Sequence, residues 1–77
     1  MNTELYDAIL ADINSAYQEW EEGRAASPSA DDLVAIALDH RPAPEHAPSP
    51  SQMAGLIYDM QVDGASNEDV ARRLAEW

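Results

Sequence analysis

Apolar side chains recur every three or four positions through the first third of the chain. Between about residues 3 and 24 they fall on one broad stripe at about 100° per residue, and the opposite face is polar and acidic. This spacing predicts a long amphipathic helix that is capped by Asn2 or Thr3 and ends at Gly23. We expect the whole stripe, including its aromatic members, to pack in the core. Its members are Leu5, Tyr6, Ile9, Leu10, Ile13, Ala16, Tyr17 and Trp20.

The second predicted helix covers about residues 30–40 and is apolar around most of its girth. Ser29 precedes it and Asp32 follows three positions later, which is the spacing of a capping box with Asp in place of the usual Glu or Gln. Its carboxylates, Asp31, Asp32 and Asp39, lie near its ends. A helix with so little polar surface is expected in the middle of the fold.

Two more helices are predicted, over about residues 50–63 and 67–77. The first has a strong start signal, with Ser49 at the cap and Gln52 three positions later. A short turn through Gly64 leads to the second, and we expect these two helices to form a tight hairpin. The apolar side of the first is predicted to consist of Met53, Leu56, Ile57, Met60 and Val62.

The pattern as a whole predicts an all-α protein, a compact bundle of about four helices in a single acidic domain, residues 1–77. No segment shows the alternation typical of a strand. The linker at residues 41–49 is rich in proline, which blocks a helix and favours extended backbone. We expect this linker to be an ordered strap or a semi-rigid spacer, although its composition alone would suggest disorder.

Acidic residues outnumber basic ones by fifteen to four, lysine is absent, and the formal net charge is −11. Scattered arginines cannot build a basic patch for phosphates, so direct binding to nucleic acid or to an anionic membrane is disfavoured. A basic protein surface, including the channel of a protein that itself holds nucleic acid, is the favoured partner. The alternative is that the excess acid serves only solubility.

Side chains suited to catalysis or metal binding are scarce. Cysteine and lysine are absent, and the chain has neither a Gly-x-Ser-x-Gly turn nor a glycine-rich phosphate loop. His40 and His46, with Asp39 or Glu45, match no standard metal spacing, and His40 is better interpreted as a helix-end cation. The sequence therefore predicts no enzyme, no cofactor and no metal site. It shows neither a secretory signal nor an apolar run long enough to cross a bilayer, so we expect a cytoplasmic location.

The carboxylates of the first helix are the most informative group of charged residues. A helix of about 20 residues is about 30 Å long, so the series predicts a rod of negative charge about as long as nine base pairs of duplex. Like charges on one face cost stability, and few arginines are placed to offset that cost. We therefore predict partner contacts at Glu4, Asp7, Asp12, Glu19, Glu21 and Glu22, and secondarily at Glu68 and Asp69.

Residues 60–74 resemble the opening of a helix-turn-helix domain. The stretch MQVDGASNEDVARRL places a helix end, a Gly-containing turn, a Ser cap and a Val-Ala-x-x-Leu helix in the order of that family. The family also needs a recognition helix in the major groove, and Arg72 and Arg73 alone cannot anchor a duplex. The resemblance therefore supports the expected hairpin and does not support DNA binding.

In size, charge and helicity the whole chain resembles the small, acidic, Cys-free helical proteins that phages encode as inhibitors, notably anti-CRISPR proteins and DNA mimics. That group shares no sequence signature, so no residue roles are transferred. The resemblance implies an inhibitor in the host-cell cytoplasm that binds a basic nucleic-acid-binding surface of a larger complex, such as a CRISPR effector, and blocks nucleic-acid access. The alternative is a small helical adaptor or regulatory protein that acts through an apolar partner or homodimer interface. The thin core and the apolar ring of Trp77 suggest this alternative.

Overall fold

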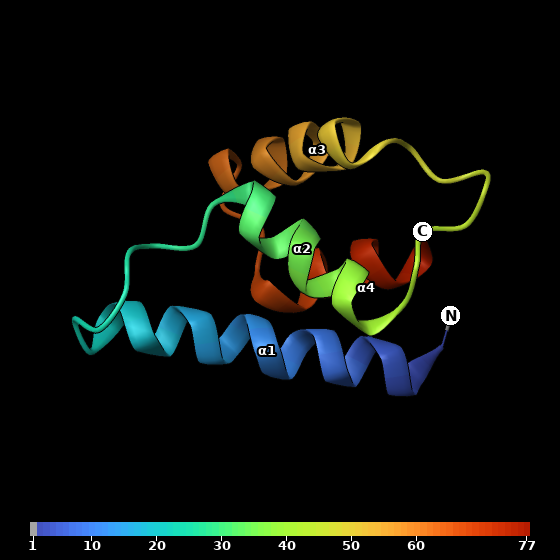
Figure 1. The fold of residues 1–77 in the computed structure, drawn as a ribbon. Helices are drawn as coiled ribbons and strands as arrows, with labels where there is room; N and C mark the ends of the chain where they lie inside the picture. The colour runs from blue at the N-terminus through green and yellow to red at the C-terminus, as the bar shows by residue number, and fades with distance from the viewer. Residues whose placement is uncertain (1) are drawn as a thin grey trace.

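The computed structural model describes residues 2–77, and these residues form four helices without a strand (Figure 1), which confirms the all-α prediction. α2 has the predicted bounds, whereas the other helices end one to three residues earlier than expected, at Glu21, Val62 and Glu76 in place of residues 24, 63 and 77. The elements are α1 (Thr3–Glu21), α2 (Ala30–His40), α3 (Pro50–Val62) and α4 (Asn67–Glu76).

A polar side chain caps the start of every helix. Asn2 caps α1, and Ser29, Ser49 and Ser66 cap α2, α3 and α4. In α2 and α3 the capping boxes are complete, because the side chain three residues on also accepts from the N–H of the capping serine, at 3.0 Å in both helices. These bonds satisfy backbone donors that a helix leaves open, so all four starts follow from local sequence.

Glycines end α1 and α3. Gly23 has a φ of 77° and Gly64 a φ of 81°, which is the left-handed region that a side chain disfavours. At each glycine, its own N–H and that of the following residue donate back to carbonyls of the last turn, which forms a Schellman motif. A helix cannot continue through this conformation, so α1 stops at Glu21, before the glycine that was predicted to mark its end.

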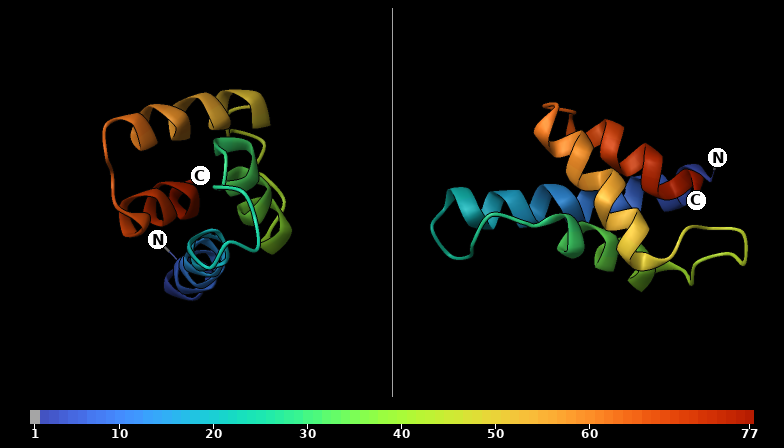
Figure 2. Two further views of the ribbon diagram at one scale, coloured as in Figure 1. Left: turned by 90° about the vertical axis from the view of Figure 1, so that its left-hand side faces the viewer. Right: turned by 90° about the horizontal axis from the view of Figure 1, so that it is seen from above.

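The helices alternate in direction along the bundle, and α2 contacts each of the other three (Figures 1 and 2). The most extensive helix–helix contacts join α1 to α4 and α2 to α3. The predicted central position of α2 is therefore confirmed. The expected tight hairpin of α3 and α4 is wrong, because the two helices diverge from the turn at Gly64, and α3 packs mainly on α2 whereas α4 packs mainly on α1.

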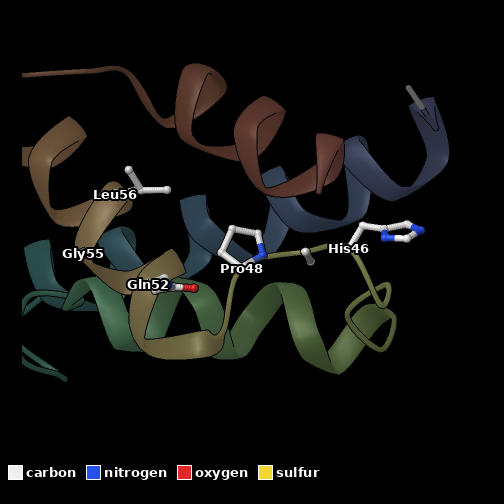
Figure 3. A pocket seen from close by; sticks show the side chains of 6 residues that line it. His46, Pro48, Gln52, Gly55 and Leu56 are labelled. Atoms are coloured by element: carbon white, nitrogen blue, oxygen red, sulfur yellow. The ribbon is translucent and has the colours of Figure 1, made fainter.

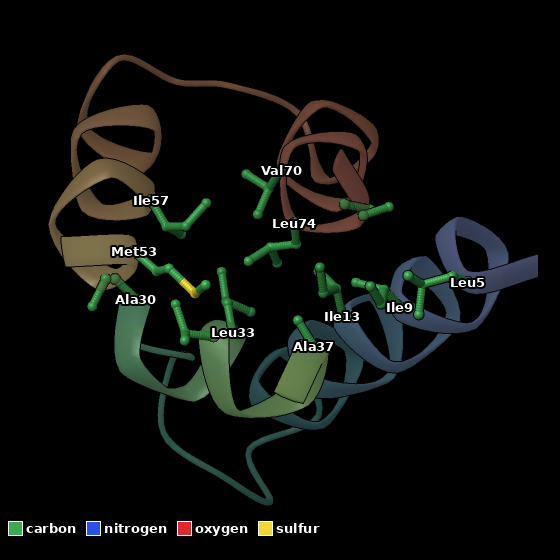
Figure 4. Close-up of a cluster of buried hydrophobic side chains, with 14 residues drawn as sticks. Leu5, Ile9, Ile13, Ala30, Leu33, Ala37, Met53, Ile57, Val70 and Leu74 are labelled. Carbon is green, nitrogen blue, oxygen red and sulfur yellow. The ribbon is translucent and has the colours of Figure 1, made fainter. Parts of the chain in front are cut away.

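The core lies between the four helices (Figure 4), and its largest fully buried side chains are Ile9, Ile13, Leu33 and Ile57. No polar or charged side chain of the described residues is buried. The radius of gyration is 11.7 Å, close to the value of about 11.5 Å expected for a compact chain of this length. The small core therefore depends on a few aliphatic side chains.

The Pro-rich segment 41–49 crosses the end of the bundle where α2 and α4 finish (Figure 1). Its one turn is closed by a hydrogen bond of 3.0 Å from the N–H of Ala47 to the carbonyl of Pro44. At its first residue, Arg41 Nη2 donates to the carbonyl of Ala75 in α4 at 3.3 Å. We call this segment the strap, because its first residues lie against α2 and α4.

Trp77 packs against the chain itself. It is half-buried, adjoins the core, and lines a small cavity together with Pro42 and Pro44 of the strap. The Arg73 guanidinium lies 5.4 Å from the centre of its ring, a cation–π arrangement. These contacts within the chain explain why Trp77 is half-buried without a partner protein.

Gly55 lies inside α3 and Gly64 in the turn that follows, so alanine substitutions at the two positions test where the helix ends. A Cβ added at Gly55 meets nothing within 4 Å. Because glycine costs a helix about 1 kcal/mol relative to alanine, we expect Gly55→Ala to raise the free energy of unfolding by about that amount. The same change at Gly64, whose φ is 81°, should lower it by about 1 kcal/mol. Urea denaturation followed by circular dichroism measures both, and shifts in the same direction would contradict the assigned turn.

Candidate protein-binding surface

All fifteen carboxylates lie on the surface of the molecule. Basic side chains engage three of them: Arg24 pairs with Glu22, Arg72 with Asp69, and His40 with Asp12. Within residues 2–77, the other carboxylates have no basic nitrogen within 4.0 Å. Most of the negative charge is therefore uncompensated by the chain's own cations.

The predicted contact residues of α1 separate into two groups. Glu4 and Asp7 lie at its start, and Glu19, Glu21 and Glu22 lie in and just past its last turn. From Asp7 to Glu21 the helix rises by about 21 Å, at about 1.5 Å per residue. The helix thus presents two acidic groups about six base pairs apart at about 3.4 Å per pair, in place of the expected continuous rod. The exposed residues between them on the outer face are uncharged: Ala11, Asn14, Ser15 and Gln18.

Asp12 faces α2 and does not join either group. Its Oδ2 lies 2.6 Å from Nε2 of His40 at the end of α2, so the pair connects the two helices. His40, interpreted from the sequence as a helix-end cation, therefore bonds across to α1. Asp12 thus connects two helices, and Glu22 is also engaged within the chain, since it pairs with Arg24 and accepts from Gln18 Nε2 at 3.0 Å.

The start of α4 lies beside the middle of α1. Asn67 Nδ2 donates to Asn14 Oδ1 at 3.0 Å, across the two helices. Glu68 and Asp69 therefore lie near the uncharged stretch of α1, and Asp69 Oδ1 accepts from Arg72 Nη1 at 3.1 Å. The fold brings Glu68 toward the gap between the two acidic groups of α1, which sequence position alone did not indicate.

One end of the molecule carries most of the carboxylates. α1 finishes at this end, which we call the Trp20 end, and on the same side of the molecule, short of the end of α1, α3 finishes and α2 and α4 begin (Figure 1). Juxtaposing two helix starts with two helix ends gathers acidic residues that are far apart in sequence. They are Glu19, Glu21, Glu22, Asp31, Asp32, Asp59, Asp63, Glu68 and Asp69.

These carboxylates fall into two physical classes. Those in the first turns of α2 and α4 are favoured by the positive end of the helix dipole and by capping. Those at the ends of α1 and α3, such as Glu21 and Asp63, lie at the negative end of the dipole, and neither helix has a basic residue in its last turn. The first class of carboxylates stabilises the helices in which they lie, and this accounts for their positions. The second class lowers the stability of its helices.

Large apolar side chains are exposed at the same end. Trp20 is 47% exposed although it continues the buried stripe of α1, because the helix extends past the other elements there (Figure 2). The prediction that Trp20 packs in the core is therefore wrong, whereas Tyr17 is half-buried and packs against the core as expected. In α3, Tyr58 is 60% and Val62 67% exposed, so Val62 does not belong to its buried side.

A chain of contacts links these side chains across the end of the bundle. The rings of Tyr17 and Trp20 meet edge to face with their centres 6.4 Å apart. Gln61 Nε2 donates to the hydroxyl of Tyr17 at 3.2 Å and to the carbonyl of Pro28 at 3.3 Å. Gln61 follows Tyr58 by three positions and precedes Val62, so Tyr17 and Gln61 bridge the exposed parts of α1 and α3. The signal for this surface was in the sequence, since Tyr58 and Val62 share a helical face opposite Met53 and Ile57.

A second apolar feature, an open hollow of about 640 Å³, lies between the strap and the outer side of α3 (Figure 3). Leu56 is 40% exposed and lies on its rim, contrary to its predicted place on the buried side. None of the lining side chains is a carboxylate, a lysine or an arginine. They are His46, Ala47, Pro48, Gln52, Gly55 and Leu56.

Within residues 2–77 no three His, Asp or Glu side chains are gathered as a metal site would require. Of the helices described, none is both long and apolar enough to cross a bilayer. No protein-family model, curated protein or solved structure matches the chain. A functional proposal therefore rests on the charge and exposure of the surface residues described above.

Proposed function

We propose that the protein acts by binding, as an inhibitor whose acidic surface occupies a basic nucleic-acid-binding surface of a larger protein complex. Carboxylates take the place of phosphates opposite lysine and arginine side chains, and nucleic acid is kept out. The resemblance to anti-CRISPR and DNA-mimic proteins makes a CRISPR effector complex the first target to test. The proposal concerns binding and requires no catalysis.

The observation that supports this proposal most is the placement of acid at the ends of α1 and α3. Glu21 and Asp63 oppose the helix dipole, no cation lies in either last turn, and both are exposed. Excess acid that served only solubility could stand at helix starts, where it also stabilises the fold. Residues that cost stability where they stand are typical of binding sites.

The structure refines which predicted residues we propose as contacts. The groups at the two ends of α1 and Glu68 remain, although Glu22 is partly engaged by Arg24 and Asp69 by Arg72. Asp12 is removed from the contact set, because His40 occupies it. A basic channel that holds a duplex or single strand offers rows of cations to such separated acidic groups.

Charge reversal at the Trp20 end tests the proposal. We expect the triple variant Glu19→Lys, Glu21→Lys, Glu22→Lys to need at least about tenfold more protein to block DNA capture by a CRISPR effector complex in a gel-shift competition. That estimate follows from losing three surface ion pairs of about 0.5–1 kcal/mol each. The matched control Asp39→Lys, Glu45→Lys, Glu76→Lys makes the same change in net charge elsewhere and should inhibit almost as well as wild type. Circular dichroism verifies that both remain helical.

Equal inhibition by the wild type and both variants would show that the carboxylates do not form the contact. Equal loss in both variants would show that net charge matters and position does not. A further check is ionic strength: inhibition should weaken markedly between low salt and about 0.5 M salt, where the screening length falls below about 5 Å.

A further inference from the structure

Trp20 on α1 and Tyr58 and Val62 on α3 are exposed apolar side chains on this side of the molecule, and half-buried Tyr17 lies between the two helices. We call Trp20, Tyr17, Tyr58 and Val62 the aromatic strip. Three of them are about half or more exposed, and the contacts of Tyr17 with Trp20 and Gln61 connect the parts on α1 and α3. Exposed tryptophan and tyrosine are over-represented at the centres of protein interfaces.

Carboxylates border the strip along both helices. Glu19 and Glu21 flank Trp20 in sequence on α1, and Asp59 and Asp63 follow Tyr58 and Val62 on α3. The sequence at this end therefore interleaves apolar and acidic side chains. A surface of this kind is complementary to one that interleaves apolar and basic side chains.

The cations nearest to this border are already engaged. Arg24 pairs with Glu22 and Arg72 with Asp69. Arg73 lines a hollow together with Asp59 and Asp63, but its guanidinium lies over the ring of Trp77. The carboxylates around the strip are thus available to cations from outside the chain.

A second copy of the chain is a poor occupant of the strip. Bringing two such ends together would place Glu19, Glu21, Asp59 and Asp63 of one copy against the same residues of the other. Each copy carries a formal net charge of −11, and like charges brought together at an interface oppose association. The charge pattern therefore favours a basic protein over a homodimer.

We propose that the aromatic strip anchors the partner and takes a basic protein segment in which arginine or lysine side chains flank at least one large apolar side chain. The apolar group lies against Trp20, Tyr58 and Val62, and the flanking cations meet the bordering carboxylates and the aromatic faces. This inference rests on the proposed function, and it adds the place of contact and the chemistry of the partner segment.

Two synthetic peptides test the inference on the full chain. In the first, arginines flank a pair of leucines; in the second, of equal length and charge, serines replace the leucines. We expect the leucine peptide to bind about tenfold more tightly than the serine peptide. In a ¹H–¹⁵N correlation spectrum the leucine peptide should shift the indole N–H resonance of Trp20 and the amide resonance of Val62. The indole N–H resonance of Trp77 should not shift.

Variants locate the contact. Trp20→Ser and, separately, Val62→Ser should abolish the preference for the leucine peptide and retain the weak binding of the serine peptide. Leu56→Ser is the matched control, because it removes an exposed apolar side chain from another side of α3 and should keep the preference. Val62 is 67% exposed, so its variant provides the test even where Trp20→Ser perturbs the end of α1.

Several outcomes overturn the inference, and they separate it from the proposed function. If both peptides bind the wild type equally and the carboxylate variants weaken both, the strip is not the anchor and the proposed function stands. Loss of the preference with Leu56→Ser in place of Val62→Ser moves the contact to the hollow beside the strap. If neither peptide binds at low salt, both proposals fail. Self-association of the wild type that Val62→Ser abolishes would identify a second copy as the occupant.

Discussion

Replacing Leu33 by alanine is expected to remove about 3 kcal/mol from the free energy of unfolding. Leu33 is 0% exposed and belongs to α2, the helix that contacts the other three. Truncating a buried leucine loses its transfer free energy and leaves a cavity, at a cost of about 2–5 kcal/mol. A chain of this length is stable by only about 4–12 kcal/mol at the usual 0.05–0.15 kcal/mol per residue. The single change therefore removes a large fraction of the total stability.

Urea denaturation followed by circular dichroism measures this loss. With a slope of about 1 kcal/mol per M, the midpoint should fall by about 3 M while the slope itself stays the same. Leu56→Ala is the matched control, since it makes the same chemical change at a side chain that is 40% exposed, and it should cost less than about 1 kcal/mol. Comparable losses in the two variants would mean that α2 is not the centre of the core.

The positions of the helices were predictable because their signals are local. Ser29 and Ser49 each find a partner three residues on, and the resulting hydrogen bonds depend on no other part of the chain. Gly23 and Gly64 end their helices for an equally local reason, the left-handed φ. The errors of one to three residues at helix ends arise because the last turn and its cap have similar composition.

The packing partners and the exposed strip depend on information that periodicity lacks. A stripe at helical spacing shows which face of α1 is apolar, but not how far along the helix other elements reach. Trp20 is on the correct face and is nevertheless 47% exposed, because α1 is longer than the bundle that covers it. The same limit explains why the predicted hairpin of α3 and α4 was wrong. Whether α4 packs on α3 or on α1 depends on the packing of all the helices in the core. The acidic border of the strip depends on the ends of α1 and α3 lying side by side, which the periodicity of each helix alone does not show.

Neutralising the carboxylates at the ends of α1 and α3 is expected to stabilise the fold. Glu21, Asp59 and Asp63 all lie in or just after a last helical turn that has no basic residue. Each opposes the helix dipole, which is worth about 0.3–1 kcal/mol per charge at low ionic strength. The triple variant Glu21→Gln, Asp59→Asn, Asp63→Asn should therefore raise the free energy of unfolding by about 1–2 kcal/mol. The gain should shrink in high salt, because screening weakens the interaction.

The control separates the helix dipole from simple repulsion among like charges. Glu4→Gln with Glu68→Gln also lowers the negative charge, but both residues lie in first turns, where the dipole favours them. This variant should be less stable than the wild type in urea at low salt. If it is stabilised as much as the triple variant, repulsion among like charges explains the effect. The position of the carboxylates at the helix ends then no longer supports the proposed function. If the two variants move in opposite directions, and the triple variant also binds the arginine peptides more weakly, the acid at the Trp20 end lowers stability and serves binding, as the proposed function requires.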